Sequence, residues 1–185
     1  MKKKVFIAIN LPENIKKRLK EFQEKFDYLP VRWTKESSLH LTLVFVGFVT
    51  NDQMLEICRA SREVAIKFDP FYINFKRIIF GPPHKPPRMI WLEGEASQGL
   101  SVLKSQLQEM LLEAETGFSN VENRPFKPHI TLARIKMFQW RQLTQQPEIE
   151  QEFLAQVPVA SIEVMESDLK YDGAEYLVLE SCPLG

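Results

Sequence analysis

Two stretches of this chain repeat one short pattern: "SSLHLTLVFVG" at residues 37–47 and "PFKPHITLARI" at residues 125–135. Each carries His-x-Thr-Leu within an apolar, β-branched run, a composition typical of a largely buried strand. The whole chain contains only three histidines, and His40 and His129 hold the same position in this pattern. We therefore expect two strands that present imidazoles to one place in the fold.

The alternation of side chains along a strand predicts which atoms reach that place. His40 and Thr42 share one face of the first strand, while Leu41 and Leu43 point to the other face. The second motif has the same parity, so His129 and Thr131 share a face. Each motif thus combines a proton-transfer group with a hydrogen-bond donor.

The composition limits the classes of function. A chain of 185 residues that is 44% apolar can form one fair-sized domain, and 24 basic residues balance 24 acidic ones. This balance argues against a broad basic surface that would bind long duplex nucleic acid. We expect any nucleic acid to be bound through a few local contacts. No stretch approaches the roughly 18 consecutive apolar residues of a membrane span. Cys58 and Cys182 have neither redox nor zinc-site spacing, which favours free thiols and a cytoplasmic location.

Hydrophobic periodicity predicts strands that alternate with helices. Expected strands cover residues 5–9, 39–46, 71–80, 89–92, 129–135, 159–166 and 175–180, with "DGAEY" as the turn between the last two. Three helices are expected: one with Pro12 in its first turn, one that starts from an Asn51 or Asp52 cap, and one that runs from about Ser97 to Glu115. Residues 140–156, broken by Pro147, are expected to be less regular. The segment "GPPHKPPR", residues 81–88, is interpreted as a linker between two halves, 1–80 and 88–185, because prolines interrupt regular structure.

Nearly the whole chain resembles the 2H phosphoesterases, and among them the LigT-like RNA 2′,3′-cyclic phosphodiesterases. The segments that carry the resemblance are "VFIAINLP", "VRWTKESSLHLTLVFVG", "PPRMIWLE", "RPFKPHITLARI" and "SDLKYDGAEYLVLE". The resemblance implies an α+β fold with one bilobal, pseudo-two-fold-symmetric domain over residues 1–185. Two antiparallel-rich sheets would flank a central cleft, with helices outside. We expect a monomer.

The resemblance also implies the chemistry. RNA 2′,3′-cyclic phosphate ends or small cyclic nucleotides would bind between the two motifs and be hydrolysed without a metal or another cofactor. It assigns His40 as proton donor and His129 as proton acceptor, with Thr42 and Thr131 donating to the phosphate. The expected product is a 2′-phosphomonoester. Opening such a ring needs one neutral and one protonated imidazole, and both forms are accessible near neutrality.

Basic residues beside the second motif are candidates for phosphate binding. Lys127 has the parity of His129 in a regular strand, although Pro128 interrupts that regularity. Arg134 has the opposite parity, so its contact with the phosphate requires a β-bulge or the strand end. Four aromatic residues are weighed as base-stacking or core side chains, and core packing is favoured for each: Trp33, Phe45, Phe48 and Phe126. His84 is interpreted as an exposed loop residue.

Other interpretations remain open at this level. A metal site fits poorly, because the chain has no HExxH sequence and the motifs bring no carboxylate. Joining RNA ends by a 2′-5′ linkage is the reverse of opening a cyclic phosphate, but no nucleotide-activating GxxxxGK[ST] sequence is present. A noncatalytic module that binds RNA ends or nucleotides is the third alternative. Such a module would need phosphate donors but not two titrating imidazoles.

Overall fold

The computed structural model describes residues 2–83, 86–114, 116–119, 126–145, 147–170 and 173–185. The helices are α1 (Glu13–Lys25), α2 (Asn51–Ala65), α3 (Gln98–Glu113) and α4 (Met137–Arg141), with a 3-10 turn η1 (Glu36–Ser38). The strands are β1 (Lys3–Asn10), β2 (Val31–Trp33), β3 (His40–Val49), β4 (Phe71–Gly81), β5 (Met89–Gly94), β6 (His129–Ile135), β7 (Glu150–Val159), β8 (Ser161–Lys170) and β9 (Gly173–Pro183). These elements confirm the predicted α+β class.

The strands form one antiparallel sheet in the order β7-β4-β5-β6-β3-β1-β8-β9, and β2 also pairs with β6. Eight of the nine strands form two four-stranded groups that meet where β3 and β6 lie side by side. A single residue pair, Leu41 with Ile130, links these two strands. The two sheets expected from the resemblance are therefore joined in one hydrogen-bonded array at this pair.

Each group of strands draws on both halves of the chain. Strand β4 pairs with β5 and β7, whereas β8 pairs with β1 and β9. The strands on either side of the proline-rich segment, β4 and β5, therefore pair with each other, and the division of the chain into halves 1–80 and 88–185 stays a prediction. The ladder continues to the loop itself, because Gly81 pairs with Met89 and the Arg88 amide donates to the Gly81 carbonyl at 2.9 Å. His84 lies outside the described residues.

Two strands and several boundaries differ from the expectation. Strand β7 lies in the segment expected to be irregular, and it tolerates Pro158 because it is an edge strand. Strand β2 is too short for its pattern to be recognised. Helix α2 is capped by Thr50, not by Asn51 or Asp52: the Thr50 hydroxyl accepts from the Gln53 amide, and the Gln53 side chain accepts from the Thr50 amide. Ser97 caps α3, which ends at Glu113.

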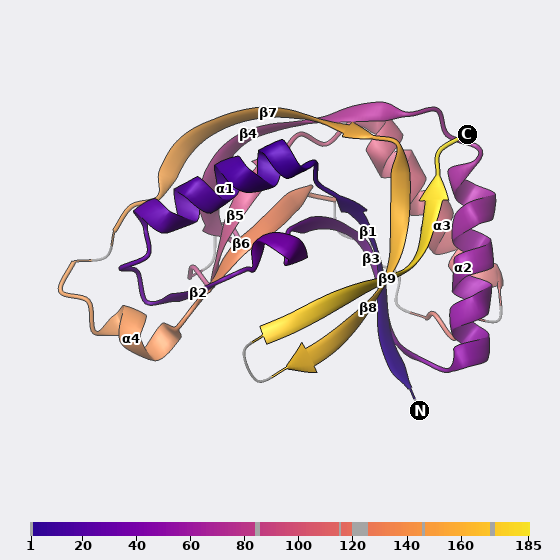
Figure 1. Cartoon of the computed structure of the whole chain (residues 1–185), viewed down its shortest axis with the longest axis horizontal. Coiled ribbons are helices and arrows are strands. Elements are labelled where there is room, and N and C mark those ends of the chain that lie inside the picture. The colour runs from indigo at the N-terminus through magenta and orange to yellow at the C-terminus, as the bar shows by residue number, and fades with distance from the viewer. Residues whose placement is uncertain (1, 84–85, 115, 120–125, 146, 171–172) are drawn as a thin grey trace.

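The sheet has a core face and an opposite face. Helix α1 buries Ile15, Leu19 and Phe22 in the main core, which continues through both strand groups. Figure 1 shows α1 over the β4–β7 side of the molecule and α2 with α3 at the far end. On the opposite face, a second, smaller cluster consists of Phe6, Ala8 and Met165 with Tyr176 packed against it. We call this second side the site face, because the motif side chains lie on it.

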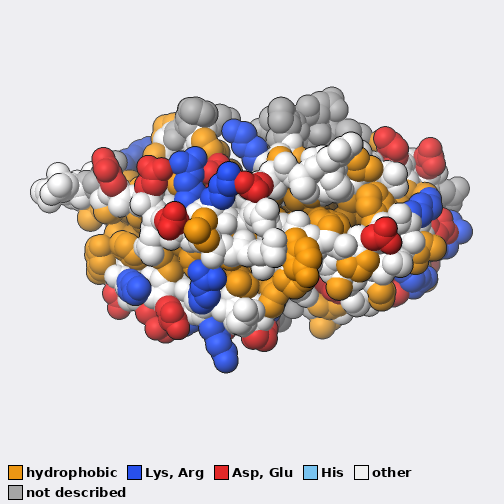
Figure 2. All heavy atoms as spheres, turned by 90° about the horizontal axis from the view of Figure 1, so that it is seen from above, with side chains coloured by type: hydrophobic (Ala, Val, Ile, Leu, Met, Phe, Trp, Pro, Cys, Tyr) orange, Lys and Arg blue, Asp and Glu red, His pale blue; other side chains and the backbone are white. Residues whose placement is uncertain are grey.

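The surface reflects the balanced composition. Figure 2 shows basic and acidic side chains interspersed over the face seen from above, without a large region of one sign. Both cysteines are buried free thiols, as predicted, and burial raises the pKa of Cys182 to about 12. None of the helices in the described part of the chain has the length and apolar character required to cross a membrane.

Candidate active site

The two His-x-Thr motifs begin the two central strands, β3 and β6. Leu41 and Ile130, the middle residues of the motifs, pair directly and are completely buried on the core face. Their neighbours in each strand must point the other way. In an antiparallel register set by this pair, His40 lies across from Thr131 and Thr42 lies across from His129. The structure therefore gathers four half-buried polar side chains, as the sequence predicted, on the site face.

The ring of His40 is fixed by two hydrogen bonds and two aromatic side chains. Its Nδ1 lies 2.8 Å from the Ser38 carbonyl oxygen, and its Nε2 lies 3.1 Å from Thr42 Oγ1. A carbonyl only accepts, so Nδ1 carries a proton in both charge states and proton transfer falls to Nε2. Phe6 and Tyr176 flank the ring, each with a centroid separation of 4.9 Å.

This environment shifts the proton affinity of His40. Burial lowers its pKa, and the hydrogen bond to the Ser38 carbonyl opposes that effect by a smaller amount. Desolvation acts in this direction because it penalises the charged imidazolium. His40 therefore favours its neutral form in the free protein.

His129 is held in a corresponding way by the other group of strands. Its Nδ1 lies 2.8 Å from the Lys127 carbonyl oxygen, which matches the bond from His40 to the carbonyl two residues before it. The indole of Trp91 stacks on the imidazole, with 3.8 Å between centroids and 23° between planes. Gly81 makes room for this indole, because a Cβ at residue 81 would collide with the Trp91 ring.

A β-bulge redirects Arg134 towards the site face. The register of β5 against β6 shifts between Ile90 and Trp91, which leaves Leu132 as the extra residue. Leu132 and Ala133 are consequently both buried, and Arg134 is exposed on the same face as Thr131. The bulge that the sequence required for a phosphate contact by Arg134 is thus present. Lys127 precedes β6; its carbonyl orients His129 and its side chain is exposed.

Strand β3 has a bulge at the equivalent place. The register of β1 against β3 shifts between Ile7 and Ala8, so that Leu43 and Val44 are both buried. Phe45 then pairs with Phe6 on the site face and is 67% exposed. The predicted core role is therefore wrong for Phe45, and also for Phe48, which is 66% exposed. Trp33 and Phe126 do pack against the core.

Sequence reasoning missed the aromatic side chains that hold the two imidazoles. Phe6, Trp91 and Tyr176 come from strands β1, β5 and β9, and only the pairing of distant segments brings them to the motifs. No local pattern marks such residues. Their site-face parity becomes informative only once the partner strands are known.

Surface hollows and candidate metal ligands are two further features that bear on ligand binding. Two hollows lie away from the motifs, one lined by residues of α2 and the end of α3 and the other by residues of β4 and β7. Within the described ranges, no three His, Cys, Asp or Glu side chains lie close enough together to hold a metal ion.

Comparisons with known proteins place the chain among its relatives. Residues 9–91 match the family model described as LigT like Phosphoesterase. The chain is 34% identical over 131 residues to an RNA 2′,3′-cyclic phosphodiesterase of Bacillus subtilis, covering 70% of this chain and 69% of that protein. It is 31% identical over 186 residues to the protein of the same name in Thermotoga maritima, covering 97% and 94%.

Solved structures agree with this relationship. A crystal structure of a Thermus thermophilus protein superposes with a TM-score of 0.80 at 26% identity, covering 100% of this chain and 98% of that one. Escherichia coli LigT complexed with 3′-AMP shares the fold, with a TM-score of 0.77 at 24% identity over 100% of this chain and 99% of that one. The identity to relatives over most of their length, together with the paired motifs, shows that this chain belongs to the LigT-like phosphoesterase family.

Proposed function

We propose that this protein hydrolyses RNA or nucleotide 2′,3′-cyclic phosphodiester ends to 2′-phosphomonoesters, using two histidines and no metal. The observation that carries the proposal is the pairing of Leu41 with Ile130, which gathers two imidazoles and two hydroxyls on one face. The names of the Bacillus and Thermotoga relatives support the same activity.

The proposed reaction is an in-line displacement at phosphorus. Water attacks the cyclic phosphate opposite the ribose 3′-oxygen, and His129 Nε2 accepts the proton that the water loses. The P–O3′ bond breaks as His40 Nε2 donates a proton to the departing oxygen, which leaves the phosphate on the 2′-oxygen. Two imidazoles on adjacent strands suit this reaction, because the acid and the base must act on opposite sides of phosphorus.

The hydroxyls of Thr42 and Thr131 would stabilise the negative charge on the non-bridging oxygens. In the free protein, the Thr42 hydroxyl is 3.1 Å from His40 Nε2. Substrate binding would turn this hydroxyl towards the phosphate and leave Nε2 for proton donation.

His40 must be protonated to act as the proton donor, whereas burial lowers its pKa in the free protein. A phosphate anion beside the ring favours the imidazolium and opposes this desolvation. Substrate binding and protonation of His40 are therefore coupled in the proposed mechanism, and each promotes the other.

Residues around the motifs would bind the rest of the substrate. The exposed side chains of Lys127 and Arg134 supply positive charge beside the second motif. The exposed ring of Phe45 offers a stacking surface for the terminal base on the side of the first motif. This arrangement suits recognition of an RNA end.

The test is incubation of an oligoribonucleotide ending in 2′,3′-cyclic phosphate with the protein in EDTA, followed by identification of the product. We expect full turnover to a 2′-phosphomonoester. A 3′-phosphomonoester would reverse the proposed direction of ring opening. No turnover of several such ends would remove the enzyme proposal in favour of a binding module, and activity abolished by EDTA would contradict the metal-free mechanism.

A further inference from the structure

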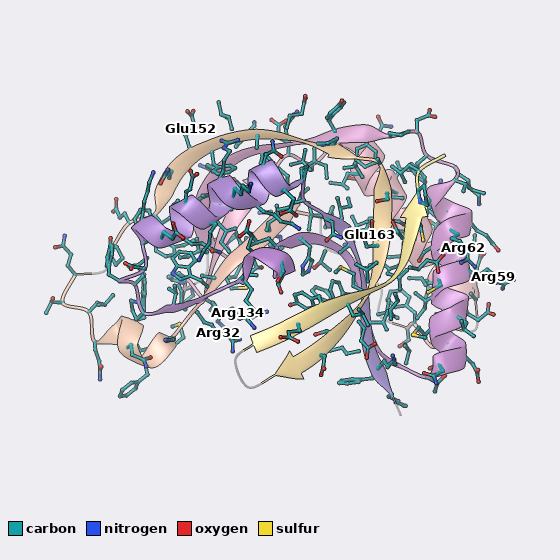
Figure 3. All side chains as sticks on the ribbon, in the orientation of Figure 1. Arg32, Arg59, Arg62, Arg134, Glu152 and Glu163 are labelled. Atoms are coloured by element: carbon teal, nitrogen blue, oxygen red, sulfur yellow. The ribbon has the colours of Figure 1, made fainter. Side chains whose placement is uncertain are left out.

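Two arginines occupy an electrostatically unfavourable arrangement beside the motifs. Arg32 of β2 pairs directly with Arg134 of β6, so both side chains lie on the site face. Figure 3 shows the two side chains together at the end of these strands, turned towards the β8–β9 hairpin. Like charges directly opposite each other in a sheet are destabilising. An arrangement of this kind becomes favourable when an anion lies between the two charges.

The described residues do not supply that anion. Arg134 Nη1 contacts the Met89 sulfur at 3.9 Å, and within the described ranges neither arginine is paired with a carboxylate. Three other arginines, by contrast, each contact a glutamate: Arg59 with Glu56, Arg62 with Glu180, and Arg77 with both Glu93 and Glu150. Within the described part of the chain, the cross-strand pair Arg32 and Arg134 thus differs from these three arginines, because neither member contacts a carboxylate.

Tyr176 connects this pair to His40. Its ring lies edge-on to His40, with 4.9 Å between centroids. Burial raises the pKa of the Tyr176 phenol, and the positive charges of Arg134 and Arg32 oppose that effect. The two arginines are therefore near enough to act on a residue that contacts His40. Along β6, Arg134 is also three residues beyond Thr131, or roughly 10 Å of strand.

We propose that Arg32 and Arg134 together bind a second phosphate, the one attached to the 5′-oxygen of the nucleotide that carries the cyclic phosphate. This inference rests on the proposed function. The cyclic phosphate itself belongs at the motifs, and the arginine pair lies further along β6, beyond Thr131. The next phosphate along an RNA strand is the nearest anion that a bound RNA end would bring there.

The chemistry of the pair fits this ligand. A guanidinium presents a planar fork of donors that binds phosphate oxygens in a bidentate manner, and two guanidiniums supply donors for both non-bridging oxygens of one phosphodiester. The site would read the phosphate and not the base, so it would favour RNA ends over nucleoside cyclic phosphates regardless of sequence. The protein would then contact only one phosphate beyond the reacting one.

The experiment compares three substrates with the full-length protein. They are cytidine 2′,3′-cyclic phosphate, the same compound with a 5′-phosphate, and the dinucleotide CpC ending in 2′,3′-cyclic phosphate. The variants are Arg32→Gln, Arg134→Gln and the double variant, with Arg59→Gln as the matched control. Arg59 lies on α2, at the opposite end of the molecule from Arg32 and Arg134, and its replacement also deletes an exposed arginine (Figure 3).

We expect each single variant to lower kcat/KM on the two substrates with a 5′-phosphate about tenfold more than on cytidine 2′,3′-cyclic phosphate. The double variant should lose less than the product of the single losses, since both side chains bind one group. The slope of log KM against log salt should fall by about 0.7 for each lost contact. A loss confined to the dinucleotide would also support the site, with a phosphodiester as its ligand.

Equal losses on all three substrates would overturn the inference, because the arginines would then act on the cyclic phosphate. Wild-type kinetics for Arg32→Gln on every substrate would overturn it as well. Lack of turnover of any substrate by the wild-type protein is a different result, which counts against the proposed function itself.

Discussion

The stack of Trp91 on His129 provides a sharp test of how the site is organised. Replacement of Trp91 by Leu removes a stacked aromatic pair with centroids 3.8 Å apart while keeping an apolar side chain in the buried space. Such a pair contributes about 0.5–1.5 kcal/mol beyond its burial. If this energy holds the imidazole in its reactive orientation, kcat should fall roughly 2- to 13-fold, since about 1.36 kcal/mol corresponds to tenfold in rate.

Two comparison variants separate orientation from general destabilisation. Trp91→Phe keeps a ring against His129 and removes a buried indole N–H that has no described hydrogen-bond partner, so its kcat should stay close to wild type. Trp140 is also buried and packs edge-on against Phe80, away from both histidines. Trp140→Leu should therefore lower the free energy of unfolding by an amount similar to Trp91→Leu without lowering kcat.

The assay pairs urea unfolding with steady-state kinetics well below the unfolding transition. An orienting role for Trp91 is refuted if Trp140→Leu lowers kcat as much as Trp91→Leu, or if Trp91→Phe is as slow as Trp91→Leu.

Further predictions address proton affinity, space and stacking. Burial lowers the pKa of His40. If His40 is the proton donor, kcat/KM should therefore fall as the pH rises through a value below the usual imidazole pKa of about 6.5, whereas kcat, which reports the substrate complex, should fall at a higher pH. A fall of kcat/KM only at a pH above about 6.5 would contradict the donor role. Gly81→Ala, whose Cβ would collide with the Trp91 ring, should reduce both the melting temperature and kcat, and a variant with normal values of both would be evidence against tight packing there. Phe45→Ala should leave stability within about 0.5 kcal/mol, because the ring is 67% exposed, but should raise KM about tenfold or more on nucleotide substrates; an unchanged KM would exclude stacking.

The sequence was most informative where local pattern and chemistry coincide. Strand β6 matches its predicted bounds, and the parity of the four motif residues is as expected, because alternation along a strand needs no knowledge of its partners. Arg134 shows the limit of such reasoning. A bulge reverses the parity after Leu132, and the strand register, which depends on β5, determines where that bulge lies.

Long-range pairing accounts for the larger differences. The prolines of residues 81–88 gave no sign that the strands before and after them, β4 and β5, pair with each other. The same limitation applies to Tyr176 and Arg32, which reach the motifs through contacts between distant strands. Strand β7 was missed because Pro147 predicts a break in the whole segment, although it lies before the strand, and because the partner strand β4 is distant in the sequence.

The most direct measurement of the central claim is leaving-group rescue in His40→Ala and His129→Ala. On a 2′,3′-cyclic phosphate end, each variant should lose on the order of 10² to 10⁴ in rate while retaining a wild-type unfolding transition. On a p-nitrophenyl phosphodiester, whose leaving group needs no protonation, activity should recover in His40→Ala and stay low in His129→Ala. Recovery in His129→Ala alone would exchange the two roles. Near-normal turnover of the cyclic end by either variant would contradict the two-histidine mechanism.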